Sequence, residues 1–169
     1  MIEPQCDYAY KFSEGLARLQ IGNKIGYIDK TGNFVIKAEY DGAYDFSETL
    51  ARVKKKNKWG YIDKTGKTIV DFKYDDCFDF MEGYANVRSG DEVTGKWGFI
   101  DQTGKIVVAP TYDGASSSSY EGVIRFQLGS EQGFLDAITL APIGAKYAET
   151  HDFSCGLARV RIEEKYGYI

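Results

Sequence analysis

Acidic side chains recur at regular intervals along the chain and are the first candidates for chemistry. They form three sets: Glu14, Glu48, Glu82 and Glu121; Asp29, Asp63, Asp101 and Asp136; and Asp41, Asp75 and Asp113. Two facing carboxylates can act as the acid and base of a glycosidase, and clustered ones can bind calcium. A residue present in every copy of a unit is expected to serve turns and contacts between copies, which all copies share. We therefore interpret the three sets as structural, with repeated calcium sites and a glycosidase as weaker alternatives.

Other catalytic groups are scarce. His151 is the only histidine, which excludes multi-histidine metal sites. It stands at a position that holds Tyr44 and Phe78 in other copies, which favours a structural role. The sequence contains no phosphate-binding glycine loop and no nucleophile elbow. These observations predict a protein that is not an enzyme and uses no cofactor and no metal.

The composition limits the classes of partner. The chain has 169 residues, of which 43% are hydrophobic and 15% aromatic, and 21 basic residues against 25 acidic ones give a net charge of −4. This excludes a disordered chain, and the absence of a long apolar run predicts no membrane insertion. The mild acidity argues against nucleic acid, which requires a concentrated basic surface. The 19 glycines against 3 prolines, together with the aromatic content, are typical of strands joined by tight turns.

Two features bear on the cellular compartment. Cys6, Cys77 and Cys155 are odd in number and widely spaced, so they form neither a disulfide framework nor a zinc pattern. We interpret them as reduced, structural thiols. The segment Met1-Ile2-Glu3-Pro4-Gln5 has neither the basic nor the apolar region of a signal peptide. Both features favour a cytoplasmic protein without fixing the compartment.

A unit of about 34 residues is repeated along the whole chain. The block Phe12-Ser13-Glu14-Gly15-Leu16-Ala17-Arg18 recurs, and its fourth residue falls at positions 15, 49, 83, 122 and 156. A second block is centred on a glycine at positions 26, 60, 98, 133 and 167, and a tyrosine lies 14 residues beyond the first four of these. Three anchors in one register predict a single array over 1–169. Its approximate units are 12–45, 46–79, 80–118, 119–152 and a partial unit 153–169, and 1–11 is the tail of a preceding unit.

This unit resembles the WG repeat of bacterial proteins, which is also called the KWG repeat. The second unit carries the match most fully, in Leu50-Ala51-Arg52-Val53, Lys58-Trp59-Gly60-Tyr61-Ile62-Asp63-Lys64-Thr65-Gly66 and Tyr74-Asp75. The departures are Ile25, Gln132 and Tyr166 at the position of the Trp, and Asp136-Ala137-Ile138-Thr139 in a turn. The resemblance implies a bacterial repeat module that presents an interaction surface. The departures argue against an equivalent Trp site in every unit.

Each unit is expected to be a three-stranded antiparallel β-meander. The segments 29–32, 63–66 and 101–104 read as tight hairpin turns, because each has Asp first and Gly fourth. Apolar runs flank these turns, and a further strand such as 16–19 precedes them. The glycines expected to anchor this structure are Gly26, Gly60, Gly98, Gly133 and Gly167 in the strands, and Gly32, Gly66 and Gly104 in the turns.

Alternation along the strands predicts which side chains face the core. Ala17 shares a side with Leu19, as Ala51 does with Val53, and we assign this side to the core. A unit of this size cannot bury its apolar face alone, so neighbouring units must stack. We expect an all-β, open, twisted array. The alternative is a closed, propeller-like ring of five units, because the chain starts and ends within a unit. The chain is then either a piece of a longer array or a ring closed by its two ends.

The surface opposite the core suggests a function in binding. The candidate surface for a ligand or partner consists of Trp59, Tyr61, Trp97, Tyr27, Tyr168, Arg18, Arg52, Arg125 and Arg159. Aromatic rings and arginines are favourable anchors for protein partners, so we predict a non-catalytic scaffold for protein–protein interaction. The alternative is a glycan or cell-envelope binding module in which Trp and Tyr rings stack on sugars. For each Trp-Gly pair we favour a packing role over ligand stacking, because the small Gly lets another strand approach closely. The sequence leaves the oligomeric state open.

Overall fold

The computed structural model describes residues 6–169. The expectation that Met1–Gln5 is not a signal peptide lies outside the described residues, as does the first part of the 1–11 tail. The described chain is built from strands alone, as predicted, and these form five antiparallel sheets. None of its segments forms a helix of the length and apolarity that a membrane crossing requires.

The sheets follow one another along the chain. The first contains β1 (Tyr8–Ser13), β2 (Leu16–Ile21), β3 (Lys24–Ile28) and β4 (Phe34–Tyr40); the second β5 (Gly42–Ala43), β6 (Leu50–Lys55), β7 (Lys58–Asp63) and β8 (Thr68–Tyr74); the third β9 (Asp76–Cys77), β10 (Tyr84–Ser89), β11 (Lys96–Asp101) and β12 (Ile106–Tyr112). The fourth contains β13 (Gly114–Ala115), β14 (Val123–Leu128), β15 (Glu131–Asp136) and β16 (Pro142–Tyr147), and the fifth β17 (Glu149–Thr150), β18 (Arg159–Ile162) and β19 (Lys165–Tyr168). Within each sheet the strands are adjacent in chain order.

The expected meander is present, but each sheet begins with a strand that was not predicted. In the second to fifth sheets this strand is only two residues long. It pairs with the strand that follows the repeated Glu-Gly block, as in Ala43 of β5 opposite Val53 of β6. Two residues are too few for an alternating pattern to be visible in a sequence. The first four sheets therefore have four strands each, and the fifth has three.

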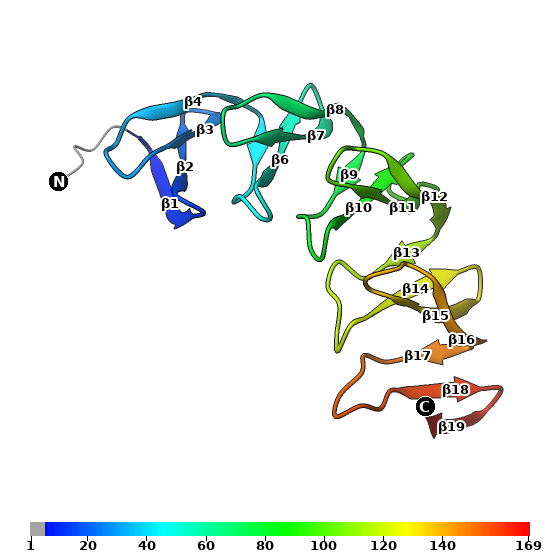
Figure 1. Ribbon diagram of the computed structural model, residues 1–169. Coiled ribbons are helices and arrows are strands. Elements are labelled where there is room, and N and C mark those ends of the chain that lie inside the picture. The colour runs from blue at the N-terminus through cyan, green and yellow to red at the C-terminus, as the bar shows by residue number, and fades with distance from the viewer. Residues whose placement is uncertain (1–5) are drawn as a thin grey trace.

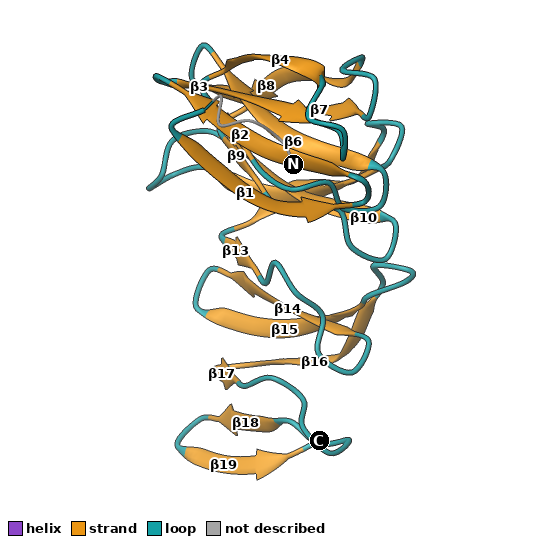
Figure 2. Cartoon of the chain, turned by 90° about the vertical axis from the view of Figure 1, so that its left-hand side faces the viewer, coloured by secondary structure: helices purple, strands orange, loops and turns teal. Residues whose placement is uncertain are grey.

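The five sheets form an open array. Figure 1 shows them stacked along a curved path, with the N-terminal and C-terminal ends at its opposite extremes. In Figure 2 the fourth and fifth sheets (β13–β19) project away from the first three. The fifth sheet does not lie beside the first, so the described chain does not form the closed ring.

The hydrophobic core lies between consecutive sheets. One cluster joins Leu16 and Tyr27 of the first sheet to Ala51 and Val53 of the second, and a second cluster joins the second sheet to the third in the same way. The assignment of Ala51 and Val53 to the core is correct. Leu50, on the opposite side of the same strand, is buried as well. Both faces of an internal sheet are therefore covered, which is the stacking expected of a short repeat.

The turns and the Trp-Gly pairs explain why these segments form strands at these places. Asp63 Oδ1 accepts hydrogen bonds from the backbone N–H of Thr65 (2.9 Å) and Lys67 (3.0 Å), and Gly66 has a φ of 87°, which favours glycine. A Cβ on Gly60 would lie 2.5 Å from the carbonyl oxygen of Val70 in β8. Only glycine allows this approach, which coincides with a bulge in the β7–β8 pairing.

The other anchor glycines divide into three groups. Gly26 and Gly98 approach the backbone of the next strand as Gly60 does, whereas Gly133 lies against the Phe126 ring and Gly167 has open space beside it. The turn glycines behave alike, since Gly32 and Gly104 also have a left-handed φ.

Candidate functional site

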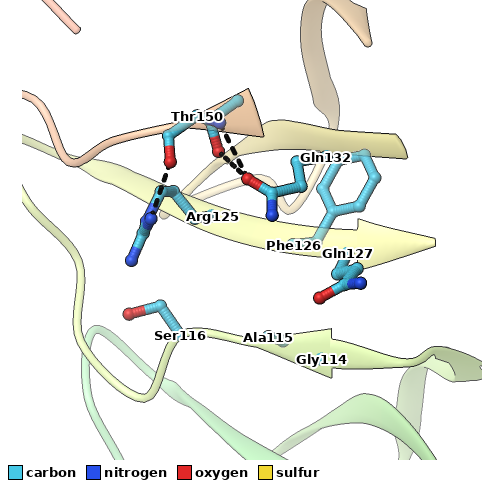
Figure 3. Close-up of a pocket in the computed structure, with 8 residues that line it drawn as sticks. All are labelled: Gly114, Ala115, Ser116, Arg125, Phe126, Gln127, Gln132 and Thr150. Atoms are coloured by element: carbon cyan, nitrogen blue, oxygen red, sulfur yellow. Dashed lines mark hydrogen bonds between the residues drawn. The ribbon is translucent and has the colours of Figure 1, made fainter. Parts of the chain in front are cut away.

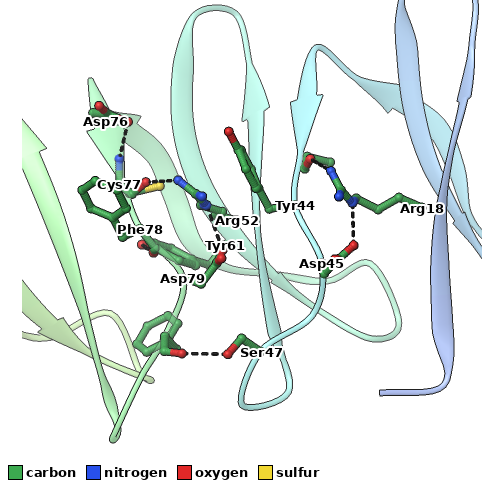
Figure 4. A network of polar contacts seen from close by, with 12 residues as sticks. Arg18, Tyr44, Asp45, Ser47, Arg52, Tyr61, Asp76, Cys77, Phe78 and Asp79 are labelled. Carbon is green, nitrogen blue, oxygen red and sulfur yellow. Dashed lines mark hydrogen bonds and ion pairs between the residues drawn. The ribbon is translucent and has the colours of Figure 1, made fainter. Parts of the chain in front are cut away.

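Arginines and aromatic rings alternate along the first three sheets. Arg18 of β2 has its Cζ 4.2 Å from the centroid of the Tyr10 ring and 5.6 Å from that of Tyr44. Arg52 of β6 has its Cζ 3.4 Å from the centroid of Tyr44 and 5.6 Å from that of Phe78. These distances allow cation–π attraction. We call Tyr10, Arg18, Tyr44, Arg52 and Phe78 the arginine–aromatic row. Figure 4 shows its members from Arg18 to Phe78.

Each arginine of the row is also tied to the next sheet. Arg18 Nε lies 2.7 Å from Asp45 Oδ1, and its Nη1 donates to the carbonyl oxygen of Ala43 at 2.6 Å. Arg52 repeats both contacts, with Asp79 at 2.8 Å and with the carbonyl oxygen of Cys77. Only 14% and 11% of the Arg18 and Arg52 side chains are exposed. The two guanidinium groups therefore hold neighbouring sheets together, and only a small part of each arginine side chain is accessible to a partner.

The two remaining candidate arginines differ from this pattern. Arg125 forms an ion pair with Asp152 at 2.6 Å and donates to the carbonyl oxygen of Thr150 at 2.9 Å. Its partners correspond to those of Arg52, but its Nε makes no hydrogen bond to the aspartate and its side chain is 36% exposed. Arg159 is exposed and contacts His151, with its Nη2 2.6 Å from the imidazole Nε2. That Nε2 also lies 2.9 Å from Glu149 Oε1. The lone histidine is therefore engaged in polar contacts with Glu149 and Arg159 at the last sheet.

Tyr27 and Tyr61 do not belong to an accessible surface, which corrects the sequence-based candidate set. Both side chains are 0% exposed because the next sheet covers them. The Tyr61 hydroxyl donates to the carbonyl oxygen of Phe78 at 2.7 Å, and Tyr27 donates in the same way to Tyr44. Burial raises the pKa of both phenols well above the ordinary value of 10.0, so both stay neutral. Tyr168, at the corresponding position of the fifth sheet, is 71% exposed because no described sheet covers it.

Trp59 and Trp97 are half-buried, and each packs on one aromatic neighbour. The Trp59 ring lies 5.8 Å from Tyr44, with Lys54 Nζ 5.6 Å from its centroid. The Trp97 ring stacks on Phe78 at 5.1 Å with an interplanar angle of 27°. Packing therefore uses part of each ring and leaves the rest at the surface beside the arginine–aromatic row.

The recurring glutamates join consecutive repeats. Glu48 Oε2 accepts a hydrogen bond from the backbone N–H of Gly83 at 2.9 Å, and Glu121 accepts one from Gly156 at 2.8 Å. Glu14 accepts from Thr49 at 3.1 Å, and a hydrogen bond from Lys64 is the main cause that lowers its pKa. The interpretation of this set as structural is supported by these contacts. Within residues 6–169, no three His, Cys, Asp or Glu side chains converge as a metal site.

The aspartates that follow the repeated tyrosine lie between a lysine and a backbone N–H. Asp75 Oδ1 lies 2.5 Å from Lys58 Nζ, and its Oδ2 accepts from the N–H of Gly90 at 2.9 Å. These contacts, the lysine first, lower the pKa of the Asp75 carboxyl below its ordinary value of 3.8. The same two causes lower the pKa of Asp41 and Asp113.

A pH dependence of stability follows from these pKa values. Because the folded-state pKa of Asp75 is lowered, its contribution is present above the unfolded-state pKa and is lost as the pH falls through the folded-state pKa. We expect Asp75→Asn to lower the urea midpoint near neutral pH, and the difference from the unchanged protein to shrink as the pH falls below 3.8. Urea titrations at a series of pH values measure this. A difference that stays constant down to strongly acidic pH contradicts the assignment.

The three cysteines are free. Burial raises the pKa of the Cys77 thiol to about 12, so this thiol stays protonated and unreactive. Cys155 is exposed and stands where other repeats carry the glutamate that contacts the next one.

Sequence reasoning missed a hollow in the fourth sheet. A cavity of about 200 Å³ is lined by residues that include Ser116, Arg125 and Gln132. The signal was visible, because Gln132 is a departure from the repeated Trp. The cavity itself was not visible, because it also needs a small residue at position 116, in a loop far from Gln132 in the sequence.

Comparisons with known proteins agree with the repeat structure. The family described as WG containing repeat matches residues 1–24, 25–59, 59–92, 97–131 and 143–166. No curated protein matches the chain. Among solved structures, a crystal structure of the eukaryotic initiation factor is 17% identical over 95% of this chain, with a TM-score of 0.49. A plant lectin with two metal binding sites from Cicer arietinum is 16% identical, covering 83% of this chain and 91% of its own, with a TM-score of 0.32.

These structural likenesses are distant. The chain spans 48% of the initiation-factor chain. At TM-scores below 0.5 and identities below 25%, neither likeness says anything about the activity of this protein.

Proposed function

The chain belongs to the WG-repeat family, and on this premise we propose that it is a non-catalytic bacterial scaffold that binds another protein through its extended β surface. The observation that carries the proposal is the arginine–aromatic row with its flanking Trp59 and Trp97. Tyr44 is 41% exposed, and its ring contacts both the Arg52 guanidinium and the Trp59 ring. Rings that are already fixed lose little conformational entropy on binding, which suits anchors of a protein interface.

The engagement of the carboxylates supports a structural scaffold over an enzyme. Glu48 and Glu121 bind backbone N–H groups of the following repeat, and Asp75 binds Lys58. A general acid or base must be available to the substrate, whereas these groups are committed to contacts that recur along the array.

Glycan binding is a second candidate, favoured by one observation. Trp59 and Trp97 keep part of their rings at the surface, where a sugar ring has room to stack. Tyr27 and Tyr61 no longer contribute to this candidate because they are buried.

The proposal is tested with a partner recovered by affinity capture on the intact chain and then purified. We expect the double variant Tyr44→Ala/Trp59→Ala to bind this partner at least roughly 30-fold more weakly, which corresponds to a loss of about 2 kcal/mol. Phe34→Ala is the matched control, since Phe34 is exposed on β4 outside the row and its loss should leave the affinity unchanged.

Circular dichroism must show that both variants remain folded. Equal affinity of the double variant and the unchanged protein contradicts the proposed surface. Retention of glycans on an array, with loss in the double variant and with no captured protein, favours the second candidate.

A further inference from the structure

The second and third sheets each carry a pair of contacting aromatic rings, and this pair is missing from the fourth sheet. Trp59 lies opposite Lys54 in the β6–β7 pairing and contacts Tyr44. Trp97 lies opposite Arg88 in the β10–β11 pairing and contacts Phe78. The same register position in β14–β15 is held by Gln132, opposite Gln127. Ser116, which follows the two-residue strand β13 directly, takes the place of Tyr44, which follows β5.

A cavity occupies the place of the missing rings. The Trp59 ring lies 3.3 Å from the position of a Cβ on Gly42, and it faces Arg52 and Lys54 at 5.8 and 5.6 Å. The cavity of about 200 Å³ is lined by the residues of the fourth sheet that correspond to Gly42, Arg52 and Lys54, namely Gly114, Arg125 and Gln127 (Figure 3). A Cβ on Gly114 would have only Gln127 among the described residues within 4 Å. The space that a Trp fills in the second sheet is therefore open in the fourth.

The walls of the cavity carry fixed hydrogen-bond donors. Thr150 is buried, and Gln132 Oε1 accepts hydrogen bonds from both its backbone N–H (2.7 Å) and its hydroxyl (3.0 Å). This fixes the amide so that its nitrogen is directed away from Thr150 (Figure 3). Arg125 Nη1 donates to the Thr150 carbonyl oxygen, and Arg125 Nε forms an ion pair with Asp152. The other terminal nitrogen of Arg125 extends towards Ser116 (Figure 3). Among residues 6–169 neither the Gln132 amide nitrogen nor Arg125 Nη2 has a hydrogen-bond acceptor.

We propose that this cavity binds one aromatic side chain, Trp or Tyr, of a partner protein. A volume of about 200 Å³ is smaller than the pockets that hold drug-sized ligands, and it suits a single side chain. The ring stacks on the Arg125 guanidinium as Tyr44 stacks on Arg52. The adjoining peptide carbonyl, or the hydroxyl oxygen where the side chain is Tyr, accepts a hydrogen bond from the Gln132 amide nitrogen. The inference rests on the proposed function, since it names the group of the partner that the scaffold receives.

The test uses three probes on the full chain with NMR detection: the blocked tripeptide Ac-Ala-Trp-Ala-NH2, its leucine analogue, and free indole. We expect the tryptophan peptide to shift the backbone amide signals of Ala115, Phe126 and Gln132, with saturation in roughly the millimolar range that one small side chain supports. The leucine peptide should produce no saturating shift. Equal responses to both peptides, no response to the tryptophan peptide, or a response to indole alone would overturn the proposal.

The blocking variant is Gln132→Trp, which installs the residue that the second and third sheets already carry. It should keep the fold, bury the new indole with a blue-shifted fluorescence emission, and abolish the shifts caused by the tryptophan peptide. If this variant does not fold, Ser116→Tyr on the opposite wall serves the same purpose. Unchanged shifts in a folded blocking variant contradict the proposal.

The outcome for the pocket can be separated from that for the scaffold. If the captured partner is lost with Tyr44→Ala/Trp59→Ala but binds the blocking variant normally, the scaffold stands and the pocket proposal fails. If the tryptophan peptide enters the pocket and no partner depends on the row, the proposed function of the row fails.

Discussion

Replacing Tyr61 with alanine is expected to lower the free energy of unfolding by about 3–5 kcal/mol, the range for removing a large aromatic side chain from a core. The Tyr61 ring is fully buried, lies 4.8 Å from the Phe80 ring, and donates its hydroxyl to the Phe78 carbonyl. All of these contacts reach the third sheet. The substitution therefore leaves a cavity between two sheets and removes the donor for a partly buried carbonyl oxygen.

Tyr168 provides the matched control for this prediction. It holds the same position in the repeat but is 71% exposed, so Tyr168→Ala should change the free energy of unfolding by less than about 0.5 kcal/mol. Tyr61→Phe removes only the hydroxyl and should cost about 1 kcal/mol. Chemical denaturation monitored by fluorescence measures all three variants. Equal losses for Tyr61→Ala and Tyr168→Ala contradict the burial of Tyr61 between sheets.

Replacing Arg52 with alanine is expected to cost about 2–3 kcal/mol. Removing one partner of a fully buried ion pair costs about 3–5 kcal/mol, and the value here is smaller because the Asp79 side chain is 42% exposed. The loss combines the contact with Asp79, the bond to the Cys77 carbonyl and the stacking on Tyr44. Arg52→Lys keeps the charge but cannot make the two directed bonds and the stacking together, so it should recover only part of the loss.

Arg159 is the control for Arg52, since it holds the same position in the last sheet and contacts no aspartate of the described residues 6–169. Its replacement by alanine should change stability by less than about 0.5 kcal/mol. A loss at Arg159 as large as that at Arg52 would show that these arginines act within their own sheet and do not join consecutive sheets.

The periodic features of the fold could be predicted from the sequence. The spacing of Gly26 and Gly60 defined the repeat, and the Asp63–Gly66 turn follows from residue chemistry that acts within four residues. The alternation of Ala51 and Val53 correctly placed the core face. All of these signals arise from residues close together in the sequence, so each repeat shows them independently of the others.

The faces of the sheets show where the sequence was insufficient. Alternation distinguishes a buried side from an exposed one only when one side of a sheet meets water. Here Leu50 and Tyr61 face the next sheet while Val53 faces the preceding one, so both sides are covered. The polar character of Arg52 suggested a surface residue, but its charge is met by Asp79 of the next sheet.

The candidate site was predictable only in part. The aromatic and arginine positions of the row could be recognised from the repeat. The cavity beside Gln132, however, also depends on the small side chain of Ser116, in the loop after β13. A single departure from a repeated residue is visible in a sequence. The empty space that two departures create together requires their arrangement in three dimensions.

The central claim is that each arginine of the row joins its own sheet to the next one, and a double-mutant cycle on Arg52 and Asp79 tests it most directly. The free energies of unfolding of Arg52→Ala, Asp79→Ala and the double variant are compared with that of the unchanged protein. We predict a coupling energy of at least about 1 kcal/mol, because the two side chains meet at 2.8 Å across two sheets. Strictly additive losses would contradict the contact and the stacked array built on it.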